Sequence, residues 1–345
     1  MPTFPSTSTS TQLRVAVIGS GDIARMHVVG YKAAGANVVA ICDISPDILA
    51  RRKREWEVDD TYTDYRDLLA NARFDAVSIC TPNSTHHPIT MASVAIGKHV
   101  LCEKPVSLDL AQGAEMVAAA NAAGVTFQVG HHLRSWASAT RAKAMIDRGE
   151  LGKVTSMRFR QAHDWSGTGV RGVFGSKAHS GGGTLLDNGC HLFDLARYFG
   201  GDVANVFGRI ARLQYEIEVE DTAHASLAFT SGAIATIETG WTSTGYHEGF
   251  WVFGTQGSLE CDSRTGATTL IHRYRAPGSP SNGTTDVATY ALNAPAAHSA
   301  HVANFLAAIR GERNVICSGS DGVEAVRLVL GAYESAEIGS TVSVR

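Results

Sequence analysis

Three ionisable residues, two of them close together and one distant in the sequence, have the chemistry of an acid–base site. Asp187 and His191 are four residues apart in a stretch with helical periodicity, so both side chains can lie on one helix face. Lys104 directly follows a short apolar run that predicts a buried strand. An imidazole can accept the proton of an alcohol, and an ammonium group can stabilise the negative charge that develops on the oxygen. Oxidation of an alcohol needs both groups, because the O–H proton leaves as the C–H hydride departs.

A glycine motif near the N-terminus predicts a dinucleotide site. It directly follows an apolar run and opens a helical stretch of about residues 22–34. Gly21 would let the backbone approach a pyrophosphate, and small Ala24 would allow close packing of helix on strand. The first N–H groups of the helix would bind the phosphates. The residues expected to hold the cofactor here are Gly19, Gly21, Asp22, Ile23 and Ala24.

Asp43 ends the second predicted strand, 24 residues after Gly19. This spacing is typical of a carboxylate that binds the adenosine ribose hydroxyls. A carboxylate would repel the 2′-phosphate of NADP, so NAD is the expected cofactor, although Arg51 and Arg52 nearby favour NADP. The alternative is that Asp43 only caps the next helix.

Two further polar motifs follow predicted strands. Thr81-Pro82-Asn83, with His86 close behind, follows the run 74–80, and Glu103-Lys104-Pro105 follows the run 98–102. Because ligands bind at the carboxyl ends of the strands in an open α/β sheet, both motifs are expected to face the cofactor.

These motifs together resemble the Gfo/Idh/MocA family of glucose-fructose oxidoreductases and inositol dehydrogenases, over nearly the whole chain. The resemblance implies that Thr81, Pro82, Asn83 and His86 line the cofactor, that Glu103 seats the nicotinamide end, and that Lys104, Asp187 and His191 are catalytic. In some relatives the lysine is assigned the proton transfer. Here His191 is the preferred base, with Asp187 orienting its imidazole and Lys104 polarising the hydroxyl.

The elements that must position these residues form two parts. Apolar runs alternate with amphipathic stretches from residue 13, and a last strand at 125–130 completes an N-terminal Rossmann domain with a doubly wound parallel sheet. Later residues predict a C-terminal domain built on a large, mostly antiparallel open sheet flanked by helices. The predicted fold class of the whole chain is therefore α/β plus α+β. The helices and strands expected there are a helix at about 136–148, a strand at 154–161, a helix at 185–199, antiparallel strands over 203–274, a loop at 277–286, and helices at 298–310 and 320–336. The expected domains are a flexible tail at 1–12, the NAD-binding domain at 13–130, and a substrate-binding and oligomerisation domain at 131–345.

Substrate contacts are expected just beyond the first domain. His132 and Arg134 follow its last strand, and Trp165 could stack on a sugar ring. Arg158 shares a strand face with Arg160, and Arg171 precedes a glycine-rich loop, so a sugar with an acidic substituent is one alternative. Solvated surface charges are the other.

Composition excludes several classes of partner. The 345 residues include 30 basic and 33 acidic side chains, with a formal charge of −3 and no polybasic stripe, so nucleic acid is not expected. No apolar run is long enough to span a membrane, and the N-terminus lacks a signal peptide, which favours a cytoplasmic protein. The six cysteines lack CxxC spacing and predict reduced core thiols. No metal is expected, because only Asp187, His191 and Asp194 share a ligand-like spacing.

Three functions fit these observations. The first is NAD-dependent oxidation of a secondary alcohol on a small-molecule carbohydrate, inositol or polyol. The second is an NAD-assisted glycoside hydrolase that oxidises, eliminates and re-reduces without net NADH production. The third is a dinucleotide-sensing protein, because a Rossmann domain alone does not imply catalysis. A homodimer or homotetramer through the C-terminal sheet is also expected, from apolar residues such as Phe229, Trp241 and Phe253.

Overall fold

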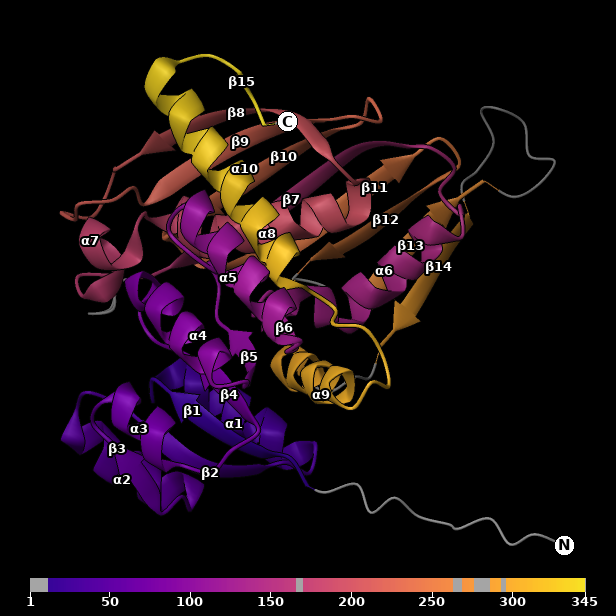
Figure 1. Cartoon of the computed structure of the whole chain (residues 1–345). Helices are drawn as coiled ribbons and strands as arrows, with labels where there is room; N and C mark the ends of the chain where they lie inside the picture. Colours follow the sequence, from indigo (N-terminus) through magenta and orange to yellow (C-terminus); the bar gives the residue numbers. More distant parts are fainter. Residues whose placement is uncertain (1–11, 166–169, 263–268, 276–285, 293–295, 345) are drawn as a thin grey trace, which may run out of the picture.

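The protein contains two β-sheets, as a computed structural model shows (Figure 1). The structure describes residues 12–165, 170–262, 269–275, 286–292 and 296–344. The predicted loop at 277–286 and the tail at 1–12 lie almost wholly outside these residues.

Six parallel strands form the first sheet, in the order β3-β2-β1-β4-β5-β6. The order reverses between β1 and β4, which makes this the doubly wound sheet that the sequence predicts. The strands are β1 (Arg14–Ile18), β2 (Asn37–Cys42), β3 (Asp60–Tyr62), β4 (Ala76–Ile79), β5 (His99–Cys102) and β6 (Phe127–Val129). Only β3 was not predicted, because its three residues contain no apolar run.

Helices cover both faces of this sheet, and each face has its own hydrophobic core. Buried side chains of α1 and α2 form one core, and those of α3, α4 and α5 form the other. These helices are α1 (Asp22–Ala33), α2 (Pro46–Trp56), α3 (Tyr65–Asn71), α4 (His86–Ala95) and α5 (Leu110–Ala123). Helix α5, which was not predicted, begins where Asp109 caps the backbone N–H of Gln112 and ends at Gly124 in a left-handed conformation.

The second sheet has nine strands, in the order β14-β13-β12-β11-β7-β10-β9-β8-β15. All neighbours pair antiparallel except β7 and β10, so the prediction of a mostly antiparallel sheet is confirmed. The strands are β7 (Val154–Asp164), β8 (Val203–Ala211), β9 (Thr222–Phe229), β10 (Ile234–Gly240), β11 (Thr242–Gly254), β12 (Gly257–Asp262), β13 (Thr269–Tyr274), β14 (Asp286–Ala291) and β15 (Val342–Ser343).

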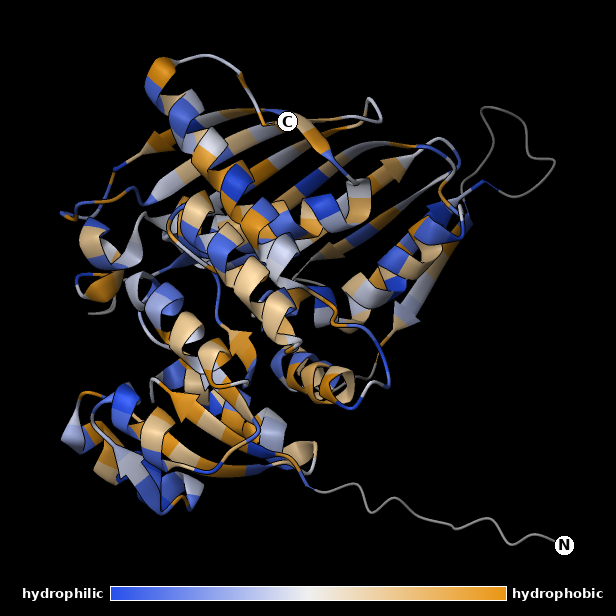
Figure 2. Cartoon of the chain, in the orientation of Figure 1, coloured by the Kyte–Doolittle hydropathy of each residue, from blue (hydrophilic) through white to orange (hydrophobic). Residues whose placement is uncertain are grey.

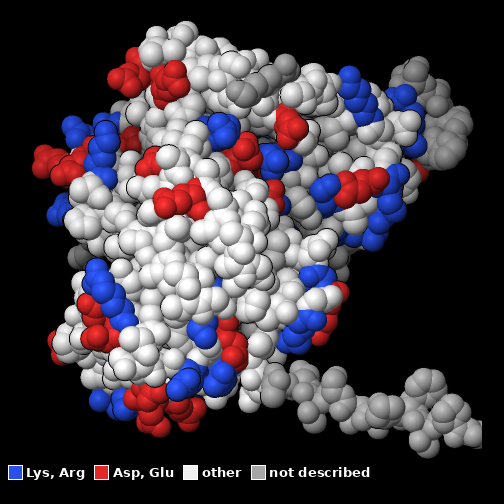
Figure 3. Space-filling view, viewed as in Figure 1, with Lys and Arg blue, Asp and Glu red and all other residues white. Residues whose placement is uncertain are grey.

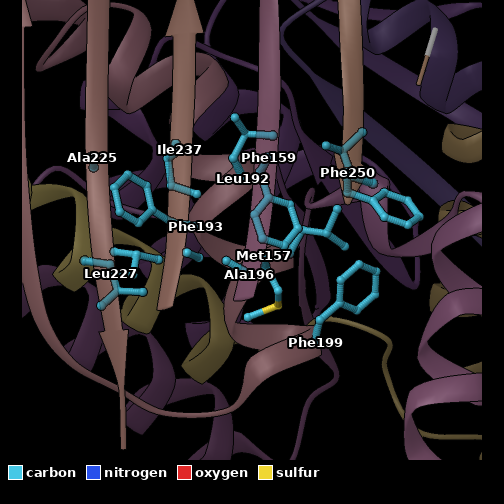
Figure 4. Packing of buried hydrophobic residues seen from close by; sticks show 14 of the residues in the cluster. Met157, Phe159, Leu192, Phe193, Ala196, Phe199, Ala225, Leu227, Ile237 and Phe250 are labelled. Atoms are coloured by element: carbon cyan, nitrogen blue, oxygen red, sulfur yellow. The ribbon is translucent and has the colours of Figure 1, made fainter. Parts of the chain in front are cut away.

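Helix α8 (Thr184–Gly200) lies along the inner face of the second sheet and carries Asp187 and His191. Figure 4 shows its Phe193 and Phe199 among strand residues that include Phe159 and Phe250. Burying a side chain of this size contributes about 1.5–3 kcal/mol, so several such contacts fix the helix on the sheet. The positions of Asp187 and His191 therefore follow from core packing.

The C-terminal helices return to the first sheet. Side chains of α9 (Ala297–Ile309) join the core under α1, and α10 (Gly319–Ile338) packs against α5, α8 and β8. Helix α6 (Ala137–Asp147) also covers the second sheet. The helices alternate hydrophobic and hydrophilic residues along their length (Figure 2), as expected for helices with one buried face.

The outer face of the second sheet, which lies opposite α8, carries only one of the three apolar residues predicted there. Phe229 and Trp241 are 4% and 0% exposed and belong to the protein's own cores, so only Phe253, at 44%, was placed correctly on the surface. The alternation along β10 does not apply to Trp241, because the strand ends at Gly240 and Trp241 lies in the bend before β11. Ile234, at 60% exposed, is a second apolar residue on the outer face.

The surface carries both signs of charge, and Figure 3 shows no large region of one sign on the face in view. All six cysteines are buried, as predicted. Within the described residues, no helix combines the length and the hydropathy that a membrane span requires.

Candidate active site

A pocket of about 670 Å³ opens at the carboxyl ends of β1, β2 and β4. It brings together predicted cofactor residues from three separate motifs. Its lining includes Ile18, Gly19, Gly21, Asp43, Ile44, Ser45, Thr81, Pro82, Thr85 and His179. The last of these lies on the short helix α7 (Lys177–Ser180), so the second half of the chain also contributes to the pocket.

The two motif glycines are needed for different reasons. Gly19 has φ +85°, and a Cβ there would lie 2.3 Å from the carbonyl oxygen of Cys80. Gly21 has φ −72°, which any residue adopts, and a Cβ there would meet nothing within 4 Å. Neither backbone strain nor a neighbouring atom therefore requires glycine at position 21. The open space in front of it is where a dinucleotide phosphate would fit.

The first turn of α1 is open to a ligand. Gly21 is the N-cap residue, and no side chain of the residues that the structure describes accepts hydrogen bonds from the backbone N–H groups of this turn. The Asp22 side chain is fully exposed, whereas Ala24 is fully buried and Ile23 packs against the core. Asp22 and Ile23 can thus contribute only their backbone N–H groups to an anion.

Asp43 is held rigidly at the end of β2. Its two carboxylate oxygens accept hydrogen bonds from the backbone N–H groups of Ser20 and Ser45, each at 2.9 Å. The N-cap of α2 is Ser45, which argues against the capping alternative for Asp43. Arg52 is buried, donates to the Ser20 carbonyl and pairs with Glu55, so it is not free to bind a 2′-phosphate.

The motif after β4 serves two purposes. Thr81 and Pro82 line the pocket, and the Asn83 amide donates to the Ser180 carbonyl at 2.8 Å, which ties the two halves of the chain together. His86 does not line the cofactor pocket as expected. It is fully buried, with its ring nitrogens 2.8 and 3.0 Å from the carbonyl oxygens of Pro105 and Thr81, so it connects the two polar motifs instead.

Lys104 and Asp187 form the central contact of the site. The Lys104 ammonium lies 2.6 Å from Oδ1 of Asp187 and 3.2 Å from its carbonyl oxygen. Burial alone would lower the pKa of Lys104, but the carboxylates of Asp187 and Glu103 outweigh it and raise that pKa. The ammonium group therefore stays charged and points at the first turn of α8.

His191 lies one turn further along α8 and is only 3% exposed. Its Nδ1 has no hydrogen-bond partner in the described part of the chain, and its ring packs edge-on against His131 and His132. Burial and then the Lys104 charge hold the pKa of His191 well below its usual value, so the imidazole is neutral. The expectation that Asp187 orients His191 is wrong, because the Asp187 carboxylate accepts a hydrogen bond from the Lys104 ammonium group instead.

Glu103, which was expected to seat the nicotinamide end, is buried. Its carboxylate lies 2.9 Å from Nε2 of His27 on α1 and accepts a hydrogen bond from the Lys104 backbone N–H. A Cβ on Gly130 would lie 2.5 Å from this carboxylate, so only glycine fits there. Burial opposes both charges, but the neighbouring Cys80 and Glu103 raise the pKa of His27 to about 10, and His27 in turn lowers that of Glu103. The resulting ion pair supports the backbone that carries Lys104.

Glu220, which the sequence analysis missed, anchors the start of α8. Its carboxylate accepts hydrogen bonds from the backbone N–H groups of Gly183 and Leu185, at 3.0 and 2.8 Å, and from the Tyr333 hydroxyl. A negative charge at a helix N-terminus stabilises the helix. This contact fixes the turn that precedes Asp187.

Two predicted substrate residues lie elsewhere. Arg134 is 4% exposed and makes two hydrogen bonds to Asp194, at 2.8 and 2.6 Å, so its role is structural. Arg158 is on the outer face of the second sheet, where it pairs with Glu238 and lies over the ring of Trp251. Arg134 was proposed from its place after the last strand of the first domain, and Arg158 as a partner for an acidic sugar, but each guanidinium already has its carboxylate.

The other three predicted substrate residues remain candidates. Trp165 packs against Trp241 and Phe174, and Arg171 lines a separate surface pocket. His132 stacks on His298 of α9, with ring centroids 3.8 Å apart, and contacts His191. His298 and His27 were missed, although a histidine on the apolar face of each helix was the available signal.

Substitutions at Gly21 and at Gly19 are expected to affect different properties, cofactor binding and stability respectively. Gly21→Val is expected to leave the thermal stability nearly unchanged and to weaken NADH binding strongly, because the added side chain fills the open space. Gly19→Ala is expected to destabilise the fold by a few kcal/mol, because of the positive φ and the Cys80 carbonyl. Thermal unfolding and NADH fluorescence titration measure both effects. Tight NADH binding by the Gly21→Val variant would contradict the assignment.

The His27–Glu103 pair predicts a pH-dependent stability. Folding raises the pKa of His27 from its ordinary 6.5 to about 10, so the stabilisation is complete below pH 6.5 and is lost as pH rises toward 10. The free energy of unfolding of wild type minus that of His27→Gln should fall over this range, by at most about 1.4 kcal/mol per pH unit. Urea unfolding at pH 6, 8 and 9.5 measures it. A difference that stays constant with pH would exclude a charged His27.

Known proteins are similar to this chain in both of its parts. Residues 13–131 match the oxidoreductase family with an NAD-binding Rossmann fold, and residues 139–260 match the GFO/IDH/MocA C-terminal domain. A myo-inositol 2-dehydrogenase of Thermotoga maritima is 31% identical over 267 residues, which cover 75% of this chain and 78% of that protein. A 1,5-anhydro-D-fructose reductase of Ensifer adhaerens is 29% identical over 343 residues, covering 96% and 98%.

A solved structure has the same fold. The levoglucosan dehydrogenase in complex with NADH and levoglucosan superposes with a TM-score of 0.88 at 23% identity, covering 97% of this chain and 100% of that one. The chain therefore belongs to the Gfo/Idh/MocA family of oxidoreductases and carries that family's NAD-binding Rossmann domain.

Proposed function

We propose that this protein catalyses the reversible, NAD-dependent oxidation of a secondary alcohol on a sugar, inositol or related polyol. The observation that carries the proposal is the 2.6 Å contact of Lys104 with Asp187, which joins the end of β5 to α8 one turn from His191. Relatives named for myo-inositol and 1,5-anhydro-D-fructose support a cyclic, polyhydroxylated substrate. In this proposal residues 13–130 bind the cofactor, and residues 131–345 bind the substrate.

The first domain fits NAD. The open space at Gly21, the free first turn of α1 and the fixed carboxylate of Asp43 match a pyrophosphate and an adenosine ribose. Asp43 would repel a 2′-phosphate, and Arg52 is already paired, so NAD is preferred over NADP. When bound, NAD would supply the acceptor for the hydride.

Each catalytic residue has one role. The Lys104 ammonium donates a hydrogen bond to the reacting hydroxyl and stabilises the negative charge that develops on its oxygen. The neutral His191 imidazole accepts the hydroxyl proton. Asp187 keeps Lys104 charged and aimed at the substrate. In the reverse direction the same imidazole returns the proton.

A cofactor and substrate panel tests this proposal. The purified protein is mixed with NAD or NADP and with inositols, hexoses, uronates, anhydrosugars and aryl glycosides, while reduced cofactor and aryl release are followed. Reduced NAD should accumulate with one polyol class, and NADP should react far more slowly. Aryl release without net NADH would instead identify an NAD-assisted glycoside hydrolase, and no turnover would favour a sensor.

The same assay tests the role of Lys104. Lys104→Met should lower the turnover number at least about 100-fold, the scale of a lost acid–base or electrostatic group. NADH binding should remain, because Lys104 does not line the pocket assigned to the cofactor. The Lys98→Met variant is the matched control, since Lys98 precedes the opposite end of β5, where it donates to the Phe74 carbonyl and lies over the Phe74 ring. Full activity of Lys104→Met would overturn the assignment.

We also propose that chains associate through the outer face of the second sheet. Exposed Ile234 and Phe253 flank Ser156 on this face, and one chain leaves them uncovered. Light scattering should give the mass of a dimer or tetramer, and Phe253→Asp should lower it. A monomeric wild type would contradict the proposal.

A further inference from the structure

The inner face of the second sheet changes from apolar to polar along β7. Met157 and Phe159 point toward α8 and are buried in the core. Further along the strand, the same face carries Gln161 and then His163. Phe159 contacts Phe199 at the end of α8, whereas His163 lies 3.1 Å from Asn188 near its start. The polar part of the strand is therefore next to Asp187.

A neighbouring strand completes a polar cluster there. Glu248 on β11 stands opposite Gln161 in the strand register. The Gln161 amide donates to Oε1 of Glu248 at 2.7 Å, and the Tyr246 hydroxyl donates to Oε2 at 2.9 Å. Tyr246 also stacks on His163, with ring centroids 5.8 Å apart. We refer to Gln161, Tyr246 and Glu248 as the polyol cluster.

The Gln161 side chain carries a buried acceptor that no described residue satisfies. It is 7% exposed, and its Oε1 has no hydrogen-bond partner in the described residues. The amide cannot be flipped, because its nitrogen must face the Glu248 carboxylate. A buried carbonyl oxygen without a donor costs about 1–3 kcal/mol, which a substrate hydroxyl would offset.

The charge of the cluster selects among sugars. The only acid of the cluster is Glu248, and burial raises the pKa of this carboxyl to about 7, so it is ionised in mildly alkaline solution. The nearby Lys104 is neutralised by Asp187. Arg158 and Arg160, the strand arginines, pair with Glu238 on the other face of the sheet. A carboxylate or phosphate on the substrate would thus meet negative charge here, whereas hydroxyl groups would find acceptors.

We propose that Gln161, Tyr246 and Glu248 bind the hydroxyl groups of an uncharged cyclic polyol and reject anionic sugars. The inference rests on the proposed function for the reacting hydroxyl, but it concerns binding and not hydride transfer. Glu248 and Gln161 Oε1 accept hydrogen bonds from hydroxyls away from the reacting carbon. These residues would therefore set which sugar is positioned beside Lys104 and His191.

Binding of sugars to the NADH complex tests the inference at pH 8.5. The neutral probes are myo-inositol, D-glucose and levoglucosan, and the anionic probe is D-glucuronate, each followed by NADH fluorescence or saturation-transfer NMR. At least one neutral probe should bind, and D-glucuronate should bind more weakly than D-glucose. Glu248→Gln should raise the dissociation constant of the neutral probe about 10-fold or more, as expected for hydrogen bonds to a charged group. The same variant should reduce the discrimination against D-glucuronate.

The matched control is Glu260→Gln on the adjacent strand β12, where the glutamate pairs with Arg273 on the surface. It should leave every dissociation constant unchanged. Tyr246→Phe removes one hydroxyl, should weaken neutral probes about threefold, and serves if Glu248→Gln does not fold.

The possible outcomes separate this inference from the proposed function. Unchanged binding of neutral probes by both cluster variants, tighter wild-type binding of D-glucuronate than of D-glucose, or no binding of any neutral probe overturns the inference. Binding that depends on Glu248 without any oxidation of the probes leaves the inference standing and overturns the proposed function.

Discussion

The contact on which the site depends is the buried ion pair between Lys104 and Asp187. Taking two charges out of water costs free energy, and their mutual attraction offsets this cost only when the geometry of the pair is good. Breaking such a pair by removing one partner typically costs about 3–5 kcal/mol. The pair also joins two parts that fold around different sheets. The end of β5 and the start of α8 must therefore both be held in place.

The pair is the outer end of a line of alternating charges that starts inside the first domain. His27 on α1 faces Glu103, Glu103 lies beneath Lys104, and Lys104 faces Asp187. Each charge is compensated by its neighbours, which explains why Glu103 and Lys104 stay ionised although they are buried. On the other side, Glu220 fixes the first turn of α8. His191, beside this line, is neutral because burial and the Lys104 charge hold its pKa low, and a neutral imidazole has a nitrogen lone pair that can accept a proton.

Much of this could be predicted from the sequence, because the relevant signals are local. The positions of Gly19, Gly21 and Asp43 relative to a strand and a helix depend on a few neighbouring residues, and their geometry is as expected. The side-chain partners that are distant in the sequence were not predicted correctly. Nothing near Arg134 in the sequence indicates Asp194, and the i, i+4 spacing of Asp187 and His191 concealed the stronger attraction of Asp187 to Lys104. Phe229 was misplaced because alternation along a strand does not say which face α8 covers, and Trp241 because it lies between two strands and packs in a separate core. Gln161 and Glu248, which pair across two strands, could not be found without the strand register.

The central claim is that the carbon bearing a sugar hydroxyl transfers its hydride directly to NAD at this site. Mass spectrometry of the cofactor after turnover with carbon-deuterated D-glucose or myo-inositol tests this claim most directly. Direct transfer predicts one deuterium in each NADH formed from the substrate that is oxidised. Product formed without reduced cofactor, or reduced cofactor without deuterium, would contradict it.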